Sequence, residues 1–319
     1  MEDAQSISDQ CGVSSCDFNQ APSFESQSFR VRGSLARALY RKQQHDDFLS
    51  NFDKRKWYQC DLSEVPSSLA SKFVQLDPDQ DTLDFLEESE KKSDWILTQM
   101  WHSLAKLFLG WFMTQTSING WLQRGSMFVL SQSHFRKILR VEETWSSGSL
   151  LDLGAGDGGV TAHMAPLFKK TYATDVSPTM KSLLQKQGYE VLDVDNWYID
   201  KKFDVISCLN LLDRCDEPLK MLDQIGGSLA TDGRVLMAIV LPFSVYVESS
   251  PDHKPKESLQ IKGSSFEKQV ESIVKNVLEP ANFEIVSWSR VPYLCEGDLQ
   301  QSYYWLDDSI FVLKKRHTD

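Results

Sequence analysis

The chain has 319 residues, and its 34 basic and 45 acidic side chains give a net charge of −11 at neutral pH. This length suffices for one large domain plus an accessory region. The sequence shows no stripe of Lys and Arg, which a nucleic-acid-binding protein needs for its phosphate contacts, so nucleic acid is excluded as an expected partner. The acidic balance suits a basic or histidine-rich protein partner, or serves solubility alone.

Cysteine, histidine and apolar patterns exclude several further classes of protein. The six cysteines include no C-x-x-C pair, as expected for free thiols in a reducing compartment, and the six histidines show no metal-ligand spacing. We therefore expect no metal. The sequence has no signal peptide, and its most apolar helical stretch, residues 95–113, is interrupted by polar side chains. We expect no transmembrane span, and an intracellular, cytoplasmic monomer.

The first part of the chain carries helical rather than strand patterns. Residues 1–33 are rich in Ser, Gln and Asp without periodicity, which predicts a disordered tail. Residues 34–145 are predicted to form a helical extension or lid. Helical patterns occur in it over residues 34–52, 93–113 and 132–140. Arg124 follows the second of these; it either pairs with a cofactor carboxylate or belongs to a structural loop.

The most informative stretch of the sequence is Ser149–Gly159, a short apolar strand that runs into a glycine turn. Asp152 precedes the turn, and the turn contains Gly154, Gly156 and Gly159. Glycine lets the backbone turn sharply and approach a ligand closely. A helix that starts directly after the turn directs its free amides toward the same ligand. This arrangement binds nucleotide-like cofactors at the carboxyl ends of strands in open α/β sheets.

Two cofactor classes compete for this turn. The three glycines satisfy the dinucleotide pattern G-x-G-x-x-G. The wider string, apolar-apolar-Asp-apolar-Gly-x-Gly-x-Gly, resembles the first motif of S-adenosylmethionine-dependent methyltransferases. Asp175 ends the next predicted strand, 23 positions after Asp152, where a carboxylate accepts hydrogen bonds from ribose hydroxyls in either class. The alternative interpretation is an ordinary glycine-rich turn that binds no cofactor.

Strand and helix patterns alternate downstream of the turn. After the turn and the Asp175 strand, we predict strands over residues 189–193, 203–209, 233–240, 283–288 and 309–313. Helical patterns lie between the early strands, over residues 177–187 and 218–229. The alternation predicts a doubly wound, mostly parallel, seven-stranded Rossmann-like α/β domain over residues 146–319. Asn196 and Trp197 follow the third strand and offer a polar group and a ring where we expect the adenine to lie.

The acceptor of the reaction is expected just past the strand 203–209, at Asn210 and Asp213. Asn210 both donates and accepts hydrogen bonds, and a helical turn places Asp213 on the same side. The Pro-Pro-Tyr that follows Asn or Asp in nucleic-acid amino-methyltransferases is absent here. In the alternative interpretation, Asn210 caps a turn and Asp213 pairs with Arg214.

Several long strings resemble the DREV family of methyltransferases. They include LDLGAGDG at residues 151–158, DVISCLNLLDRCD at 204–216 and PYLCEGD at 292–298. Residues 116–128 and 303–308 share the similarity, which runs from about residue 57 to residue 313. Members of the family begin with an apolar, membrane-directed leader that residues 1–50 lack, and the resemblance leaves association with the endoplasmic reticulum or mitochondrion open.

The resemblance implies a protein-histidine methyltransferase that modifies the pros nitrogen of histidine in His-x-His motifs of protein substrates. S-adenosylmethionine is the implied cofactor. Asp213 would hold the substrate imidazole, and Tyr304 would line the peptide groove. Asn210 and Tyr293 would border both the cofactor and the acceptor. Asp175 stands where the family has Glu, and its ribose contact would be kept with a shorter side chain.

Other functions fit parts of the same pattern. A methyltransferase acting on a small molecule or on another protein side chain would share the cofactor residues Asp152, Gly154, Gly156 and Asp175. A catalytically silent fold could serve as a binding scaffold, although the intact turn, Asn210 and Asp213 argue against it.

Overall fold

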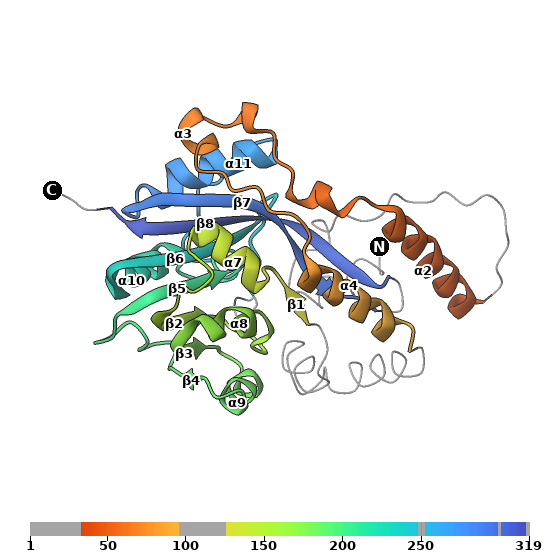
Figure 1. Cartoon of the computed structure of the whole chain (residues 1–319), viewed down its shortest axis with the longest axis horizontal. Helices are drawn as coiled ribbons and strands as arrows, with labels where there is room; N and C mark the ends of the chain where they lie inside the picture. The colour runs from red at the N-terminus through yellow and green to blue at the C-terminus, as the bar shows by residue number, and fades with distance from the viewer. Residues whose placement is uncertain (1–32, 96–125, 248–249, 251–252, 299–300, 317–319) are drawn as a thin grey trace.

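The computed structural model describes residues 33–95, 126–247, 250, 253–298 and 301–316. Its centre is one eight-stranded mixed sheet with the order β1-β7-β8-β6-β5-β2-β3-β4 (Figure 1). The strands are β1 (Met127–Phe128), β2 (Ser147–Leu153), β3 (Phe168–Thr174), β4 (Glu190–Val191), β5 (Phe203–Leu209), β6 (Leu229–Leu241), β7 (Phe283–Glu296) and β8 (Tyr303–Lys315). Strands β6, β5, β2, β3 and β4 run parallel, whereas β8, β7 and β1 join antiparallel.

Helices precede, connect and follow these strands. The α-helices are α2 (Ser34–Asn51), α3 (Ser67–Ala70), α4 (Gln80–Ser93), α7 (Gln132–Leu139), α8 (Gly159–Met164), α9 (Pro178–Lys186), α10 (Pro218–Ser228) and α11 (Phe266–Ile273). Short helical turns are η1 (Lys54–Tyr58), η2 (Leu62–Glu64), η3 (Ala165–Leu167) and the π-helical η4 (Val274–Leu278).

Local sequence signals account for several helix starts. The Ser177 side chain accepts a hydrogen bond from the Met180 amide at the N-terminus of α9, and Pro178 occupies the first helical position. Asp79 caps α4 in the same way through the Thr82 amide. Its carboxylate also accepts a hydrogen bond from the Ser131 hydroxyl, the cap of α7. One carboxylate thereby joins the starts of two helices.

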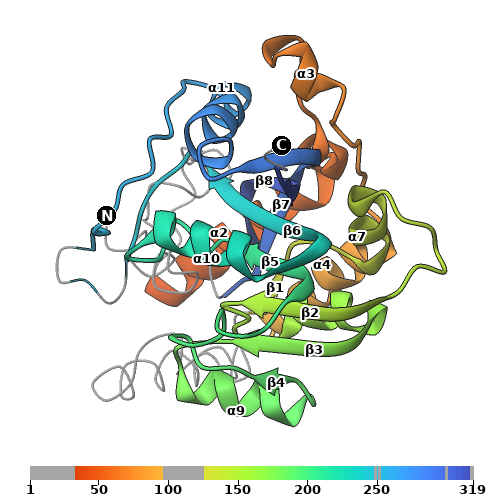
Figure 2. The same ribbon diagram turned by 90° about the vertical axis from the view of Figure 1, so that its left-hand side faces the viewer.

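Helices cover both faces of the sheet (Figure 2). One buried apolar cluster packs η1, α4, α7 and α8 against one face, with Trp57 and Phe135 among its largest side chains. A second cluster packs α3, α10 and α11 against the other face, around Phe203 and Trp288. Burial on both faces explains why β5 and β6 are nearly continuous apolar runs.

The long strands β7 and β8 extend beyond the parallel strands toward α2 and α4 (Figure 1). Lys42 of α2 connects these parts. Its ammonium group lies 2.6 Å from an Asp46 carboxylate oxygen and 2.9 Å from one of Asp94, and it donates a hydrogen bond to the Ser302 hydroxyl next to β8. Lys42 is buried, so these contacts fix α2 against the end of the β7–β8 hairpin.

The sheet confirms the expected α/β architecture and corrects the expected count of seven strands. The eighth strand, β1, pairs Met127 with Cys295 and Phe128 with Leu294 at the edge beside β7. A two-residue strand is too short for a period of two to appear in the sequence. Among the described residues, no helix is long and apolar enough to cross a membrane. The predicted helix over 93–113 lies almost wholly outside the described residues.

Candidate active site

The sheet brings the predicted site residues from three strands to one edge. Leu153 at the end of β2 pairs with Thr174 of β3 on one side and Cys208 of β5 on the other. The residues that follow these strand ends are the glycine turn, Asp175 and Asn210. The strands are parallel neighbours, so their carboxyl ends meet at the crevice where open α/β sheets bind ligands.

The glycine turn adopts a backbone that favours glycine. Gly154 and Gly156 have φ values of +68° and +58°, in the left-handed region. A Cβ atom at Gly154 would lie 3.0 Å from the Leu211 side chain, whereas one at Gly156 would meet no atom within 4 Å. The backbone at Gly156 is therefore open to a close approach from outside, as a cofactor-binding turn requires.

Asp152 lies beneath this turn and is almost fully buried. One carboxylate oxygen accepts a hydrogen bond of 2.6 Å from the Ser207 hydroxyl of β5, and the other accepts one from the Thr161 hydroxyl of α8. Burial raises the pKa of Asp152 to about 6, and these two hydrogen bonds oppose the shift. Both oxygens are engaged within the protein, so Asp152 links β2, β5 and α8 and shapes the turn from below.

Asp175 supports the turn from the side of β3. Its carboxylate accepts hydrogen bonds from the Gly156 amide at 3.0 Å and from the Ser177 amide at 2.7 Å. Burial raises the pKa of Asp175, and the amide hydrogen bonds oppose that shift. Each carboxylate oxygen has a second lone pair, so Asp175 retains acceptor capacity for a ligand while it holds the turn.

Asn210 follows β5 in a left-handed conformation, with φ at +52°. Its amide N–H donates to the carbonyl oxygen of Ala238 in β6 at 3.0 Å, and its side-chain Nδ2 donates to Asp308 Oδ2 in β8 at 2.8 Å. The remaining amide oxygen, Asn210 Oδ1, is buried and has no hydrogen-bond partner among the described residues. Such an orphaned acceptor fits a donor group on a bound cofactor.

Asp213 lies three residues beyond Asn210, in the turn that leads toward α10, and is buried. Its Oδ2 lies 3.7 Å from Arg214 Nε, and its Oδ1 has no hydrogen-bond partner within the described part of the chain. Burial raises the pKa of this carboxyl, and the nearby Arg214 guanidinium opposes the shift. The Asp213 carbonyl accepts a hydrogen bond of 2.9 Å from the Tyr246 amide, which fixes the turn.

The remaining predicted residues differ in their surroundings. Tyr293 of β7 is buried, and its hydroxyl contacts the sulfur of Met127. The Tyr304 hydroxyl of β8 donates to Asp298 at 3.0 Å. Asn196 is exposed in the turn after β4, but the neighbouring Trp197 ring is buried in the core and is not available to stack on an adenine. Arg124 lies outside the described residues.

These residues fit S-adenosylmethionine better than a metal ion. The open backbone at Gly156, the Asn210 side-chain oxygen without a partner and the buried carboxyl of Asp175 suit a ligand that carries hydrogen-bond donors. Within the described ranges, no cluster of three or more His, Cys, Asp or Glu side chains has the arrangement of a metal site.

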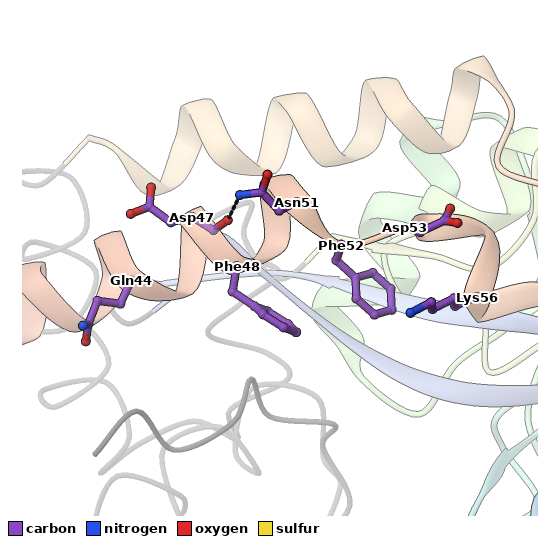
Figure 3. A pocket seen from close by; sticks show the side chains of 7 residues that line it. All are labelled: Gln44, Asp47, Phe48, Asn51, Phe52, Asp53 and Lys56. Atoms are coloured by element: carbon purple, nitrogen blue, oxygen red, sulfur yellow. Dashed lines mark hydrogen bonds between the residues drawn. The ribbon is translucent and has the colours of Figure 1, made fainter. Parts of the chain in front are cut away.

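A separate pocket of about 620 Å³ lies along α2 and η1 (Figure 3). The rings of Phe48 and Phe52 line it together with polar side chains that include Asp47 and Lys56. None of the predicted site residues that the structure describes borders it, so it is distinct from the crevice at the strand ends.

Three site residues were not singled out from the sequence as functional. Ser207 carried a local signal, because it is the one hydroxyl in the apolar run of β5. Thr161 and Asp308 carried none, because their partners, Asp152 and Asn210, are distant in sequence and meet them only through the sheet and α8.

Comparisons with known proteins identify the family of the chain. The family described as DREV methyltransferase matches residues 57–315. A crystal structure of an S-adenosylmethionine-dependent methyltransferase from Clostridium acetobutylicum is 18% identical, with a TM-score of 0.35, over 53% of this chain and 85% of that chain. A complex of DhpI with SAH is 15% identical, with a TM-score of 0.39, over 73% of this chain and 98% of that chain. Both TM-scores are below 0.5, so the assignment of the chain to a family rests on the match to the family model alone.

Proposed function

The chain belongs to the DREV methyltransferase family, its cofactor is S-adenosylmethionine, and we propose that it methylates the pros nitrogen of histidine in His-x-His motifs of protein substrates. The observation that carries this proposal is the buried carboxyl of Asp213, whose Oδ1 has no hydrogen-bond partner among the described residues. Family membership supports a methyltransferase, and the choice of histidine rests on what Asp213 does for an imidazole.

A neutral imidazole has one N–H group and one lone pair. When Asp213 accepts the tele N–H, the proton is fixed on the tele nitrogen and the lone pair is fixed on the pros nitrogen. A carboxylate fixes the tautomer of a histidine in hydrolase triads by the same principle. Histidine has a pKa near 6.5, so most of it is neutral at pH 7 and no strong general base is required.

The protein contributes orientation to the reaction. When bound, S-adenosylmethionine supplies an electrophilic methyl group on a sulfonium. Asp213 and the turn behind it hold the imidazole so that its pros lone pair is in line with that methyl carbon, and correct orientation of this kind lowers a barrier by several kcal/mol. Transfer of that methyl group would form the new N–C bond as the S–C bond broke, and it would leave the positive charge on the imidazole. The Asp213 carboxylate then faces an imidazolium, which it stabilises and whose tele proton it accepts or passes to water.

The cofactor would be held by residues from the three strand ends. We propose that the cofactor approaches the backbone at Gly154 and Gly156. Its ribose would contact Asp175, and its adenine would lie at the turn that contains Asn196. Asp152 would act by shaping the turn. Asn210 and Tyr293 would border the methionine part and the acceptor, Arg124 would pair with the cofactor carboxylate, and Tyr304 would line the peptide groove.

Incubation of the protein with methyl-labelled S-adenosylmethionine and a His-x-His peptide tests this function. We expect cofactor-dependent label on the peptide, and none when both histidines are replaced by glutamine. Label that persists in the glutamine peptide would assign the activity to another side chain. Binding of S-adenosylmethionine without any transfer would favour a silent scaffold.

A further inference from the structure

Asp308 lies at the centre of the β6–β8–β7 half of the sheet. It pairs with Val240 of β6 on one side and with Val291 of β7 on the other. Its side chain is fully buried, and none of the ion pairs in the described part of the chain includes it. A carboxyl group in this position costs free energy unless another group requires it, and packing alone would be served better by an apolar side chain.

The partner of Asp308 is Asn210, at the carboxyl end of β5. Asn210 is fixed at two points: its backbone N–H donates to β6 through Ala238, and its side-chain Nδ2 donates to Asp308 Oδ2 in β8 at 2.8 Å. Asp308 Oδ2 accepts this hydrogen bond, so the amide nitrogen of Asn210 faces β8. The amide oxygen, Asn210 Oδ1, is left for another donor.

The groups around Asp308 are acidic or neutral. Burial is the main cause of the raised pKa of Asp308, the charges of Asp213 and Asp307 add to it, and hydrogen bonds from the Asn210 side chain and the Ile239 backbone oppose it. Asp307 is itself paired with Arg290 at 2.8 Å. Within the described ranges, none of these groups donates to Asn210 Oδ1, so a bound ligand can supply that donor.

We propose that Asp308 is a positioning residue that holds the Asn210 side chain so that Asn210 Oδ1 accepts a hydrogen bond from S-adenosylmethionine. The methionine ammonium is the charged donor that this acceptor suits. The inference rests on the proposed role of Asn210 at the cofactor, and it adds a residue of β8 that does not touch the cofactor itself.

Calorimetric titration of the full chain with S-adenosylmethionine tests the role of Asp308. Asp308→Leu removes the acceptor and keeps the branched shape of the side chain, whereas Asp308→Asn removes the ionisable group and keeps an acceptor oxygen. We expect Asp308→Leu to weaken affinity at least tenfold and Asp308→Asn to stay within threefold of the wild type. Asp307→Asn, which changes the adjacent acid on the same strand, is the matched control and should leave affinity unchanged. Asp308→Ala, which adds no volume, is measured in parallel, and thermal unfolding verifies that each variant folds.

A double-mutant cycle separates positioning from a general structural effect. In an Asn210→Ala background, Asp308→Leu or Asp308→Ala should weaken binding less than threefold, because the group that it positions is gone. An unchanged loss in that background, or wild-type affinity in both variants, would overturn the proposal. Wild-type affinity in Asn210→Ala alone would instead refute the cofactor role of Asn210. Normal cofactor binding with no methylation of histidine peptides would refute the proposed function and leave the role of Asp308 intact.

Discussion

The side-chain amide of Asn210 donates a hydrogen bond to the carboxyl group of Asp308 over 2.8 Å, although 98 positions separate the two residues in sequence. This contact joins the end of parallel strand β5 to the middle of antiparallel strand β8. The antiparallel half of the sheet therefore takes part in the candidate site, because Asp308 of β8 holds the side chain of Asn210 at the end of β5.

Replacing Asp213 by Asn should remove the group that orients the imidazole while leaving the cofactor site intact. We expect the methylation rate at saturating cofactor to fall at least about 100-fold, with affinity for S-adenosylmethionine within about threefold of the wild type. Asp216→Asn is the matched control, because Asp216 lies in the same segment and its side chain pairs with Lys256 at 2.8 Å. Equal turnover of Asp213→Asn and wild type would refute the proposed role.

Gly156→Ala should weaken cofactor binding more than it weakens the fold. The left-handed backbone costs an alanine about 1–2 kcal/mol, but its Cβ would meet no atom of the protein within 4 Å. It would instead stand where the cofactor approaches the turn. Gly188→Ala provides the control, because Gly188 has a φ of +87° and equally open surroundings after α9. We expect both variants to lose similar thermal stability and Gly156→Ala alone to lose affinity for S-adenosylmethionine. Equal cofactor affinities of the two variants would contradict the assignment of the turn.

Ser207→Ala should destabilise the protein through Asp152. The substitution removes the 2.6 Å hydrogen bond to a buried carboxyl oxygen, and an unsatisfied buried acceptor costs about 1–3 kcal/mol. Ser63→Ala, which loses a hydrogen bond of the same 2.6 Å length to the exposed carboxylate of Asp61, should cost less than about 0.5 kcal/mol. Denaturant unfolding measures the change in unfolding free energy for each variant. An equal change in both would argue against the role of Asp152 in linking β2, β5 and α8.

The titration of Asp308 predicts a pH-dependent gain in stability from Asp308→Asn. Burial raises the pKa of Asp308 to about 8, against about 3.9 in an unfolded chain. Between these values the folded protein holds a proton that the unfolded chain releases, so rising pH favours unfolding. The contribution is fully present below about pH 4 and is lost as the pH rises to about 8.

Thermal unfolding of wild type and Asp308→Asn at pH 5, 7 and 9 measures this effect. The variant has no proton to lose at this position, so its stability relative to the wild type should increase from pH 5 to pH 9. Asp152 and Asp175 also have raised pKa values, but they are common to both proteins and cancel in the difference. A difference that is independent of pH would show that Asp308 is ionised throughout this range.

The sequence predicted the local part of the fold and site, because those features are contiguous. The glycine turn after β2, the apolar run of β5 and the start of α9 each depend on neighbouring residues, and the structure has them where the patterns indicate. Trp197 shows the limit of such patterns: its position after β4 suggested a ring near an adenine, but packing against the second apolar cluster buries it.

Pairings between distant segments were beyond the sequence patterns. Asp152 was predicted as a cofactor ligand, and only the approach of Ser207 and Thr161 reveals that both its oxygens are used internally. The role of Asp308 likewise depends on the register that places β8 beside β6. Neither contact leaves a periodic signal, because hydrogen bonds between side chains of separate elements depend on tertiary packing.

The position of the methyl group on the histidine ring tests the central claim most directly. A His-x-His peptide, treated with the protein and S-adenosylmethionine, is hydrolysed, and its methylhistidine is identified by chromatography and mass spectrometry against the pros and tele standards. If Asp213 accepts the tele N–H, the product is pros-methylhistidine alone. Tele-methylhistidine as the main product would contradict the account.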